Sequence, residues 1–345
     1  MKFIKVIPQG KSQWKFFALR WAIILMFSGW AIFYVTSAPG ESYSGSFKAL
    51  SHEEEKIGDS LKKHVVMISD TIGDRNLFSD EGYVKLKETS EYISNEFKRY
   101  GYNPLIQSYE VESKIVDNIE VEITGDSIPN EIIVIGAHYD SFPYCPGAND
   151  NASGIAALLV MAEQFANRSF PRTIKFVAFV NEEPPYFQTE NMGSWQYANR
   201  ARQRGENIVA MVSLETIGHY SDDKGSQKYP PPFNLFYPDA GNFIGFVGNL
   251  SSKKLMFQMI KSFRENTAFP SEGIAAPQWI SGIGWSDQWS FWEADYDAIM
   301  ITDTAPFRYR YYHTGDDTWD RLNYSKMARV VNGILQAIIS IFGNA

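Results

Sequence analysis

The chain has 345 residues, of which 44% are hydrophobic and 15% aromatic, so it can bury the core of one large domain. The first 20 residues carry five of the 32 basic side chains and no acidic one, which leaves 27 basic and 40 acidic residues in the rest. A body this acidic repels polyphosphate, and the charge balance therefore excludes nucleic acid as a partner.

The N-terminal segment joins a basic tail to an apolar run. We expect residues 1–15 to form a short cytoplasmic tail and residues 16–38 to form a transmembrane signal anchor, because an apolar run of this length can cross a bilayer as a helix. The positive flank predicts that the N-terminus stays in the cytoplasm. The rest of the chain would then be exported, either to the periplasm or to the cell exterior.

The alternative for this segment is a signal peptide that is cleaved after residues 36–38. The length of the apolar run and the position of Pro39 directly after it favour the uncleaved anchor. Cys145 is the only cysteine, so the exported chain has no intramolecular disulfide and must be stabilised by packing alone.

A small, polar stretch at residues 39–50 is expected to link this segment to a globular body at residues 51–345. Ser51 and Glu54 have the spacing of a capping box, which predicts that a helix begins there. Ser79 opens a second amphipathic helix. Strands are then predicted at residues 105–111, 118–123 and 131–140.

Helical and strand-like segments alternate in the second half of the body. Helices are predicted at residues 151–167, 193–205, 251–266 and 324–342, and apolar strands at residues 173–180, 207–215 and 296–304. Such alternation is typical of βαβ units. We therefore predict a three-layer α/β/α fold, in which a mostly parallel but mixed, twisted central sheet carries helices on both faces.

Acidic residues and histidines follow the ends of the predicted strands. They are His138 and Asp140, Glu182 and Glu183, Glu215, and His313, with Asp150 in the loop before a helix. In open α/β sheets, ligands bind beyond the carboxyl ends of the strands. Carboxylates gathered at that edge repel one another unless a cation is present. A mixed set of imidazoles and carboxylates is what zinc binds in catalytic sites.

Five motifs, GAHYDS, GANDNASG, NEEPP, SLETIG and YYHTGDDT, carry these residues. Their order and spacing resemble those of the co-catalytic zinc exopeptidases, a family that includes bacterial leucyl aminopeptidases and glutamate carboxypeptidase and has the glutaminyl cyclases as relatives. The resemblance covers roughly residues 50–342, and the combination of motifs is specific although each motif alone is weak. It implies that residues 51–345 form a zinc exopeptidase catalytic domain.

The resemblance also implies a ligand set for two zinc ions. Asp150 would bridge the ions, His138 and Glu215 would complete one site, and Glu183 and His313 would complete the other. Glu215 departs from the family pattern, because the best-known aminopeptidases have the shorter aspartate at this place. Either the longer side chain still reaches the metal, or the site has lost that ligand. We favour ligation, since an unpaired carboxylate is costly beside other acids.

Three further residues have implied catalytic roles. Glu182 would be the general base, because adjacent glutamates on a sharp turn project differently and one can bind metal while the other accepts a proton. Asp140 would orient the ring of His138. Tyr312 resembles a tyrosine that stabilises the oxyanion of the tetrahedral intermediate in some relatives, although a role as a core aromatic is an equal alternative.

The predicted activity is hydrolysis of N-terminal residues from peptides by a membrane-anchored aminopeptidase. One alternative is a glutaminyl-cyclase-like acyltransferase that uses one zinc ion. Another is a catalytically inactive receptor or adhesion domain on the same fold, which would be expected to have lost ligands. The complete ligand set and the adjacent Glu182 and Glu183 favour the peptidase.

Overall fold

The computed structural model describes residues 10–343, which belong to two compact units, Met1–Ser37 and Ala38–Ala345. In the first unit, α1 (Lys11–Thr36) is a single helix with no buried side chain. Among the described residues it is the one helix that is long and apolar enough to cross a membrane. A signal sequence near an N-terminus has the same length and composition, so these properties alone do not separate the two.

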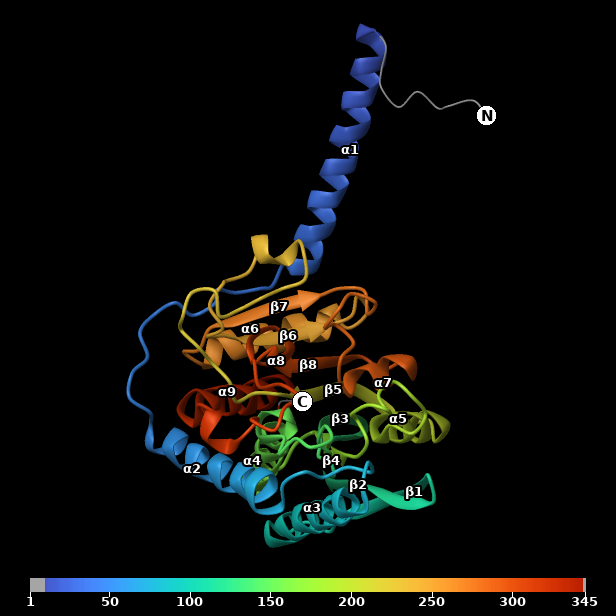
Figure 1. Cartoon of the computed structure of the whole chain (residues 1–345), viewed down its shortest axis with the longest axis vertical. Coiled ribbons are helices and arrows are strands. Elements are labelled where there is room, and N and C mark those ends of the chain that lie inside the picture. The colour runs from blue at the N-terminus through green and yellow to red at the C-terminus, as the bar shows by residue number, and fades with distance from the viewer. Residues whose placement is uncertain (1–9, 344–345) are drawn as a thin grey trace. The chain divides into compact units, whose positions relative to one another are not determined.

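The second unit is built on an eight-stranded mixed sheet with the strand order β1-β2-β4-β3-β5-β8-β6-β7 (Figure 1). The strands are β1 (Leu105–Val111), β2 (Lys114–Ile123), β3 (Ile128–His138), β4 (Arg172–Phe179), β5 (Asn207–Glu215), β6 (Ile244–Gly248), β7 (Ser271–Ala275) and β8 (Ala298–Thr302). The pairs β3 with β4, β3 with β5, β5 with β8, and β6 with β7 are parallel, and the other pairs are antiparallel.

Helices cover both faces of this sheet, so the predicted three-layer α/β/α class is confirmed (Figure 1). One face carries α2 (His52–Val66), α3 (Asp80–Arg99), α4 (Ser153–Phe165), α6 (Lys253–Asn266) and α9 (Tyr324–Phe342). The other carries α5 (Gly193–Gln203) and α7 (Gln288–Glu293), and the short α8 (Ala305–Arg308) follows β8. The central strands are aliphatic on both sides because both sides are buried.

Local signals in the sequence account for several element boundaries. Ser51 accepts a hydrogen bond from the backbone N–H of Glu54, and the Glu54 carboxylate accepts one from the backbone N–H of Ser51 at 2.7 Å, so the predicted capping box is confirmed. The strands β6 and β7 are not among those predicted from the sequence. Each has five residues and contains glycine, which weakens the strand signal. These two strands extend the sheet beyond β8 and make β7 its outer edge.

The parallel arrangement of β3, β4 and β5 directs the carboxyl ends of all three strands to one edge of the sheet. The candidate residues follow those ends. His138 is the last residue of β3, Glu215 is the last residue of β5, and Glu182 and Glu183 come shortly after β4. The fold therefore places side chains that are far apart in the sequence beside one another.

Candidate metal centre

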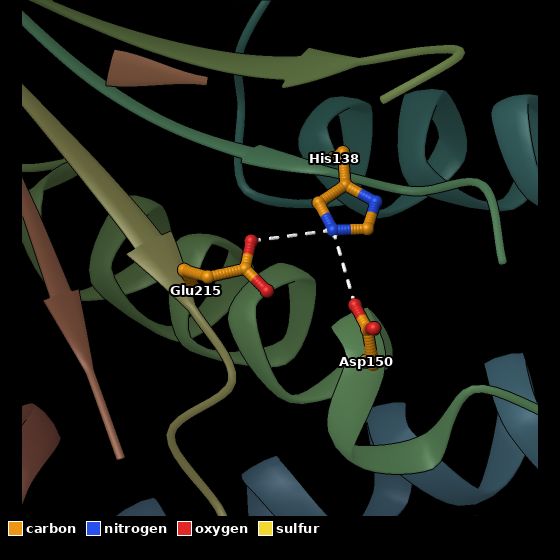
Figure 2. Close-up of side chains that lie close together, drawn as sticks. All are labelled: His138, Asp150 and Glu215. Carbon is orange, nitrogen blue, oxygen red and sulfur yellow. Dashed lines mark ion pairs between the residues drawn. The ribbon is translucent and has the colours of Figure 1, made fainter. Parts of the chain in front are cut away.

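The proposed metal ligands lie in two groups that share Asp150. The first group is His138, Asp150 and Glu215, and the second is Asp150, Glu183 and His313; within each group the ligand atoms lie within 4.8 Å of one another. Figure 2 shows the first group, in which His138 Nε2 is 3.3 Å from Asp150 Oδ1 and 3.3 Å from Glu215 Oε2. In the second group, His313 Nε2 is 3.1 Å from Asp150 Oδ2 and 3.1 Å from Glu183 Oε2. The two oxygens of Asp150 thus face different histidines, as a bridging carboxylate requires.

Asp140 connects the end of β3 to the turn after β4. Its carboxylate accepts hydrogen bonds from the backbone N–H groups of Glu182 at 3.0 Å and Glu183 at 3.1 Å. The same carboxylate lies 3.4 Å from His138 Nδ1. Asn181, which begins this turn, has φ 58°, a left-handed conformation that suits asparagine. Asp140 therefore holds both the imidazole and the turn that carries the two glutamates.

Glu182 lies beside the two groups but belongs to neither. Its carboxylate is buried, and Oε2 is 3.8 Å from His138 Nε2. Glu183 also has a buried carboxylate, which points toward His313 instead. The adjacent glutamates therefore reach different parts of the site. This allows Glu183 to bind metal while Glu182 stays free to accept a proton.

His313 is held between two aromatic rings. Phe142 stacks on it with the ring centroids 4.2 Å apart, and Tyr312 stacks on it at 3.8 Å. Burial raises the pKa of the Tyr312 phenol well above its usual range, and the carboxylates of Asp150 and Glu183 raise it further. The phenol therefore keeps its proton and remains a hydrogen-bond donor at the rim of the site.

The donor set fits a cation on structural grounds. Both ring nitrogens of His138, Oε1 of Glu183 and Nε2 of His313 are buried without a hydrogen-bond partner among the described residues. Buried polar atoms of this kind are rare, because an unpaired buried group loses its hydration without compensation. Imidazole nitrogens and carboxylate oxygens are the ligands that zinc takes in catalytic sites. A divalent ion in each group would satisfy Nε2 of His138 and Nε2 of His313, whereas Nδ1 of His138 lies 3.4 Å from the Asp140 carboxylate.

The electrostatics of the carboxylates also favour a cation. Burial and, after it, the Asp150 carboxylate raise the pKa of Glu183 to about 8, against the opposing effect of His313. Burial also raises the pKa of Glu182 well above its usual range, to which the Glu215 and Glu183 carboxylates add against the opposing effect of His138. Burial alone would raise the pKa of Asp150, but the imidazoles of His138 and His313 lower it below its usual range. These carboxylates can ionise together only when positive charge balances them.

Asp317 and Ser286 support the ligands, and the sequence analysis did not assign them. The Asp317 carboxylate accepts hydrogen bonds from the backbone N–H groups of Asn149 at 2.9 Å and Asp150 at 3.1 Å. The Ser286 hydroxyl donates to Glu215 Oε2 at 2.6 Å. Asp317 lies inside the YYHTGDDT motif, so that motif contained a signal for it, whereas Ser286 lies in none of the five motifs.

Arg75 is a second kind of residue that the sequence analysis missed. Its guanidinium is fully buried and donates hydrogen bonds to the carbonyl oxygens of Tyr139 and Pro146, both at 2.6 Å, and of Gly147 at 3.0 Å. It therefore holds the loop between β3 and Asp150 from inside. The side chain comes from the segment after α2, and its local sequence gives no signal of this role.

A largely apolar pocket begins at the first ligand group. Glu215 and Tyr312 form part of its wall, and the residues that line it further away are mostly aromatic or aliphatic: Tyr229, Phe233, Tyr237, Phe243, Ile274, Ile283, Trp285 and Phe307. Gln227 and Glu272 are polar exceptions. The pocket can therefore accept an apolar side chain next to the candidate metal centre.

Comparisons with known proteins place this chain in a family. Residues 118–338 match the model of peptidase family M28. The uncharacterized protein YfbL of Escherichia coli is 36% identical over 287 residues, which cover 80% of this chain and 86% of YfbL. Aminopeptidase YwaD of Bacillus subtilis is 45% identical over 213 residues, which cover 60% of this chain and 40% of YwaD.

Among solved structures, BSAP, a zinc aminopeptidase from Bacillus subtilis, superposes with a TM-score of 0.67 over 84% of this chain and 95% of that protein. Its sequence identity is 13%, so this likeness concerns the fold alone. The family match covers more than half of the chain, and the resemblance to the zinc exopeptidases is thereby confirmed. The chain belongs to peptidase family M28 and is a zinc metallopeptidase.

Proposed function

We propose that this chain is a membrane-anchored aminopeptidase that uses two zinc ions to remove N-terminal residues from peptides. The observation that carries the proposal is the pair of ligand groups that share Asp150, with Glu182 beside them and in neither. The relative YwaD is named an aminopeptidase, which supports cleavage at the N-terminal end of the peptide. The anchor rests on α1, which is uncharged from Trp21 to its end at Thr36.

In the proposed site, His138, Asp150, Glu183, Glu215 and His313 would hold the two ions. Zinc, when bound, acidifies water and polarises a carbonyl group. Glu182 would accept a proton from the attacking water and return it to the leaving amine. Asp140 would keep the His138 ring and the Glu182 turn in place, through the contacts it makes with both.

Tyr312 would act on the substrate oxygen. A phenol keeps its proton at neutral pH, and burial raises the pKa of Tyr312 still further, so it can donate a hydrogen bond to the oxyanion that develops during attack. Tyr312 also lines the apolar pocket together with Glu215. The side chain of the N-terminal residue would occupy that pocket while its peptide bond lies at the metal ligands.

A panel of aminoacyl reporters tests this function. We expect leucyl and phenylalanyl reporters to be cleaved at least about 100-fold faster than glutamyl reporters, because a substrate carboxylate would be buried in an apolar pocket beside Glu215 and Glu272. A chelator should abolish the activity, and added zinc should restore it. The measurement is kcat/KM for each reporter with N-terminally acetylated peptides as the control. Cleavage of acetylated peptides, or conversion of glutaminyl peptides to pyroglutamate in place of hydrolysis, would contradict the proposal.

Fractionation of cells tests the anchor. The full chain should stay in the membrane pellet after alkaline washing, whereas a chain that begins at Ala38 should be soluble and folded, because α1 contributes no buried side chain. Reporter hydrolysis by the soluble chain would show that it is folded. Recovery of a soluble product of the full-length gene that begins near Pro39 would show instead that the segment is a cleaved signal peptide.

A further inference from the structure

The chain that follows α1 is attached to the outer edge of the sheet. Arg264 of α6 donates hydrogen bonds to the carbonyl oxygens of Pro39 at 3.0 Å and Gly40 at 2.8 Å, and also to the carbonyl oxygen of Ser271 in β7 at 2.6 Å. The backbone N–H of Ser271 in turn donates to the Ser42 hydroxyl at 2.9 Å. This part of the expected linker is therefore held against β7 and does not hang freely from the body.

Ala38 is the first residue of the body and follows the apolar helix in the sequence. Its side chain packs against Gly273 in the middle of β7 and joins the hydrophobic core from the outside. α1 ends at Thr36, so only Ser37 separates it from Ala38, and two residues span at most about 7 Å. If α1 lies in a bilayer, the surface of that bilayer must therefore pass close to β7.

A second segment lies at the same edge of β7. The hydroxyl of Tyr237 donates a hydrogen bond to the carbonyl oxygen of Gly273 at 2.8 Å, the residue that Ala38 contacts. Tyr237 belongs to residues 229–238, which read YPPPFNLFYP and contain no charge. We call residues 229–238 the apolar loop. In Figure 1 it is the yellow segment beyond β7 at the end of the sheet.

The side chains of the apolar loop divide between the inside and the outside. Tyr229 and Phe233 pack around Tyr237, with ring centroids 5.6 Å and 6.4 Å from it, and all three line the pocket beside the candidate metal centre. Leu235 is 75% exposed and Phe236 is 51% exposed, and neither lines that pocket. The loop therefore has a packed aromatic base that lines the pocket and an apolar tip that is exposed.

We propose that the tip of the apolar loop, Leu235 and Phe236, inserts into the interface of the membrane that holds α1. This inference rests on the proposed anchor and adds a second contact with lipid. An uncharged tip with a leucine and a phenylalanine, on a loop rich in aromatic rings, is typical of segments that lie at the headgroup boundary. The acidic body gains nothing from anionic headgroups, so insertion of apolar side chains is the interaction that this surface offers.

The last turns of α1 carry aromatic rings that are typical of the headgroup boundary. Trp30 and Tyr34 are stacked at a centroid distance of 5.5 Å near the end of the helix. Such rings are enriched where the hydrocarbon core meets the headgroups. Ala38 follows within a few residues and contacts the same strand as the loop. With both contacts, the body that carries the candidate metal centre would be held at the membrane surface.

Fluorescence quenching in nanodiscs of phosphatidylcholine tests the inference with the full chain. Leu235→Cys is labelled with an environment-sensitive dye, and lipids with a nitroxide near the headgroup are the quencher. The matched control is Leu105→Cys, since Leu105 is also a leucine, is 54% exposed, and lies in β1 at the opposite edge of the sheet. Cys145 is buried, so the unaltered chain serves as the unlabelled blank.

We expect the dye at position 235 to lose at least about half of its emission to the quencher and the dye at position 105 to change little. Equal, weak quenching at both positions in chains that co-elute with nanodiscs would overturn the inference and leave the anchor intact. If the dye at position 235 is not quenched by the lipid but contacts the dye of a second chain, the tip belongs to a dimer interface and the inference is overturned. A chain that fails to enter nanodiscs would overturn both the anchor and the inference, whereas hydrolysis of a soluble reporter would still test the aminopeptidase.

Discussion

Glu182→Gln is expected to lower kcat/KM for a leucyl reporter by about 100-fold to 10,000-fold while the zinc content stays that of the unaltered chain. The amide has nearly the shape of the carboxylate but cannot accept a proton. Glu182 belongs to neither ligand group, so its substitution leaves the ligand atoms in place. The measurement is reporter kinetics with zinc analysis of the same preparation.

Glu183→Gln is the matched control for that variant, because it makes the same chemical change one residue later. Glu183 Oε2 is 3.1 Å from His313 Nε2, inside the second ligand group, so this variant should lose zinc as well as activity. If Glu182→Gln lost zinc and Glu183→Gln kept it, the two roles would be reversed. If neither variant lost activity, the proposed mechanism would be wrong.

Glu215→Ala is expected to lower the zinc content to about one ion per chain and to reduce activity strongly. Glu215 Oε2 is 3.3 Å from His138 Nε2 and accepts a hydrogen bond from Ser286, so the longer glutamate reaches the first group from the end of β5. A structure with zinc should place a Glu215 oxygen about 2.0 to 2.2 Å from a metal that also contacts His138 and Asp150.

A control for Glu215→Ala comes from the opposite end of the same strand. Glu206 precedes β5 and pairs with Lys175 at 3.1 Å, outside both ligand groups. Glu206→Ala should therefore keep the zinc content of the unaltered chain. An unchanged zinc content in Glu215→Ala would contradict the assignment of this glutamate as a metal ligand.

The general form of the fold was predictable because it depends on local periodicity. The aliphatic runs that became β3, β4 and β5 and the amphipathic runs between them are visible in single stretches of sequence. Parallel strands present their carboxyl ends at one edge, so residues after those ends could be expected to meet there. For this reason His138 and Glu215 lie in one ligand group, and Glu183 lies in the second group, which shares Asp150 with the first.

Weak local signals explain what was missed. β6 and β7 are short and contain glycine, so neither the hydrophobic pattern nor strand propensity marked them. Without β7, nothing in the sequence indicated that Ala38 and Tyr237 would contact the same residue, Gly273. The apolar loop likewise reads as a proline-rich connection until the edge strand beside it is known.

The sequence by itself therefore determined the fold class, the family and the candidate side chains at the strand ends, since each of these follows from local patterns and from their order along the chain. Only the tertiary structure decided how these side chains face one another: the two oxygens of Asp150 point to different histidines, Asp317 holds the Asp150 backbone from 167 residues away, and Arg75 holds Gly147 from 72 residues away. Contacts at such separations depend on how whole elements pack, and packing depends on the combined shape of many buried side chains, which no single stretch of sequence records.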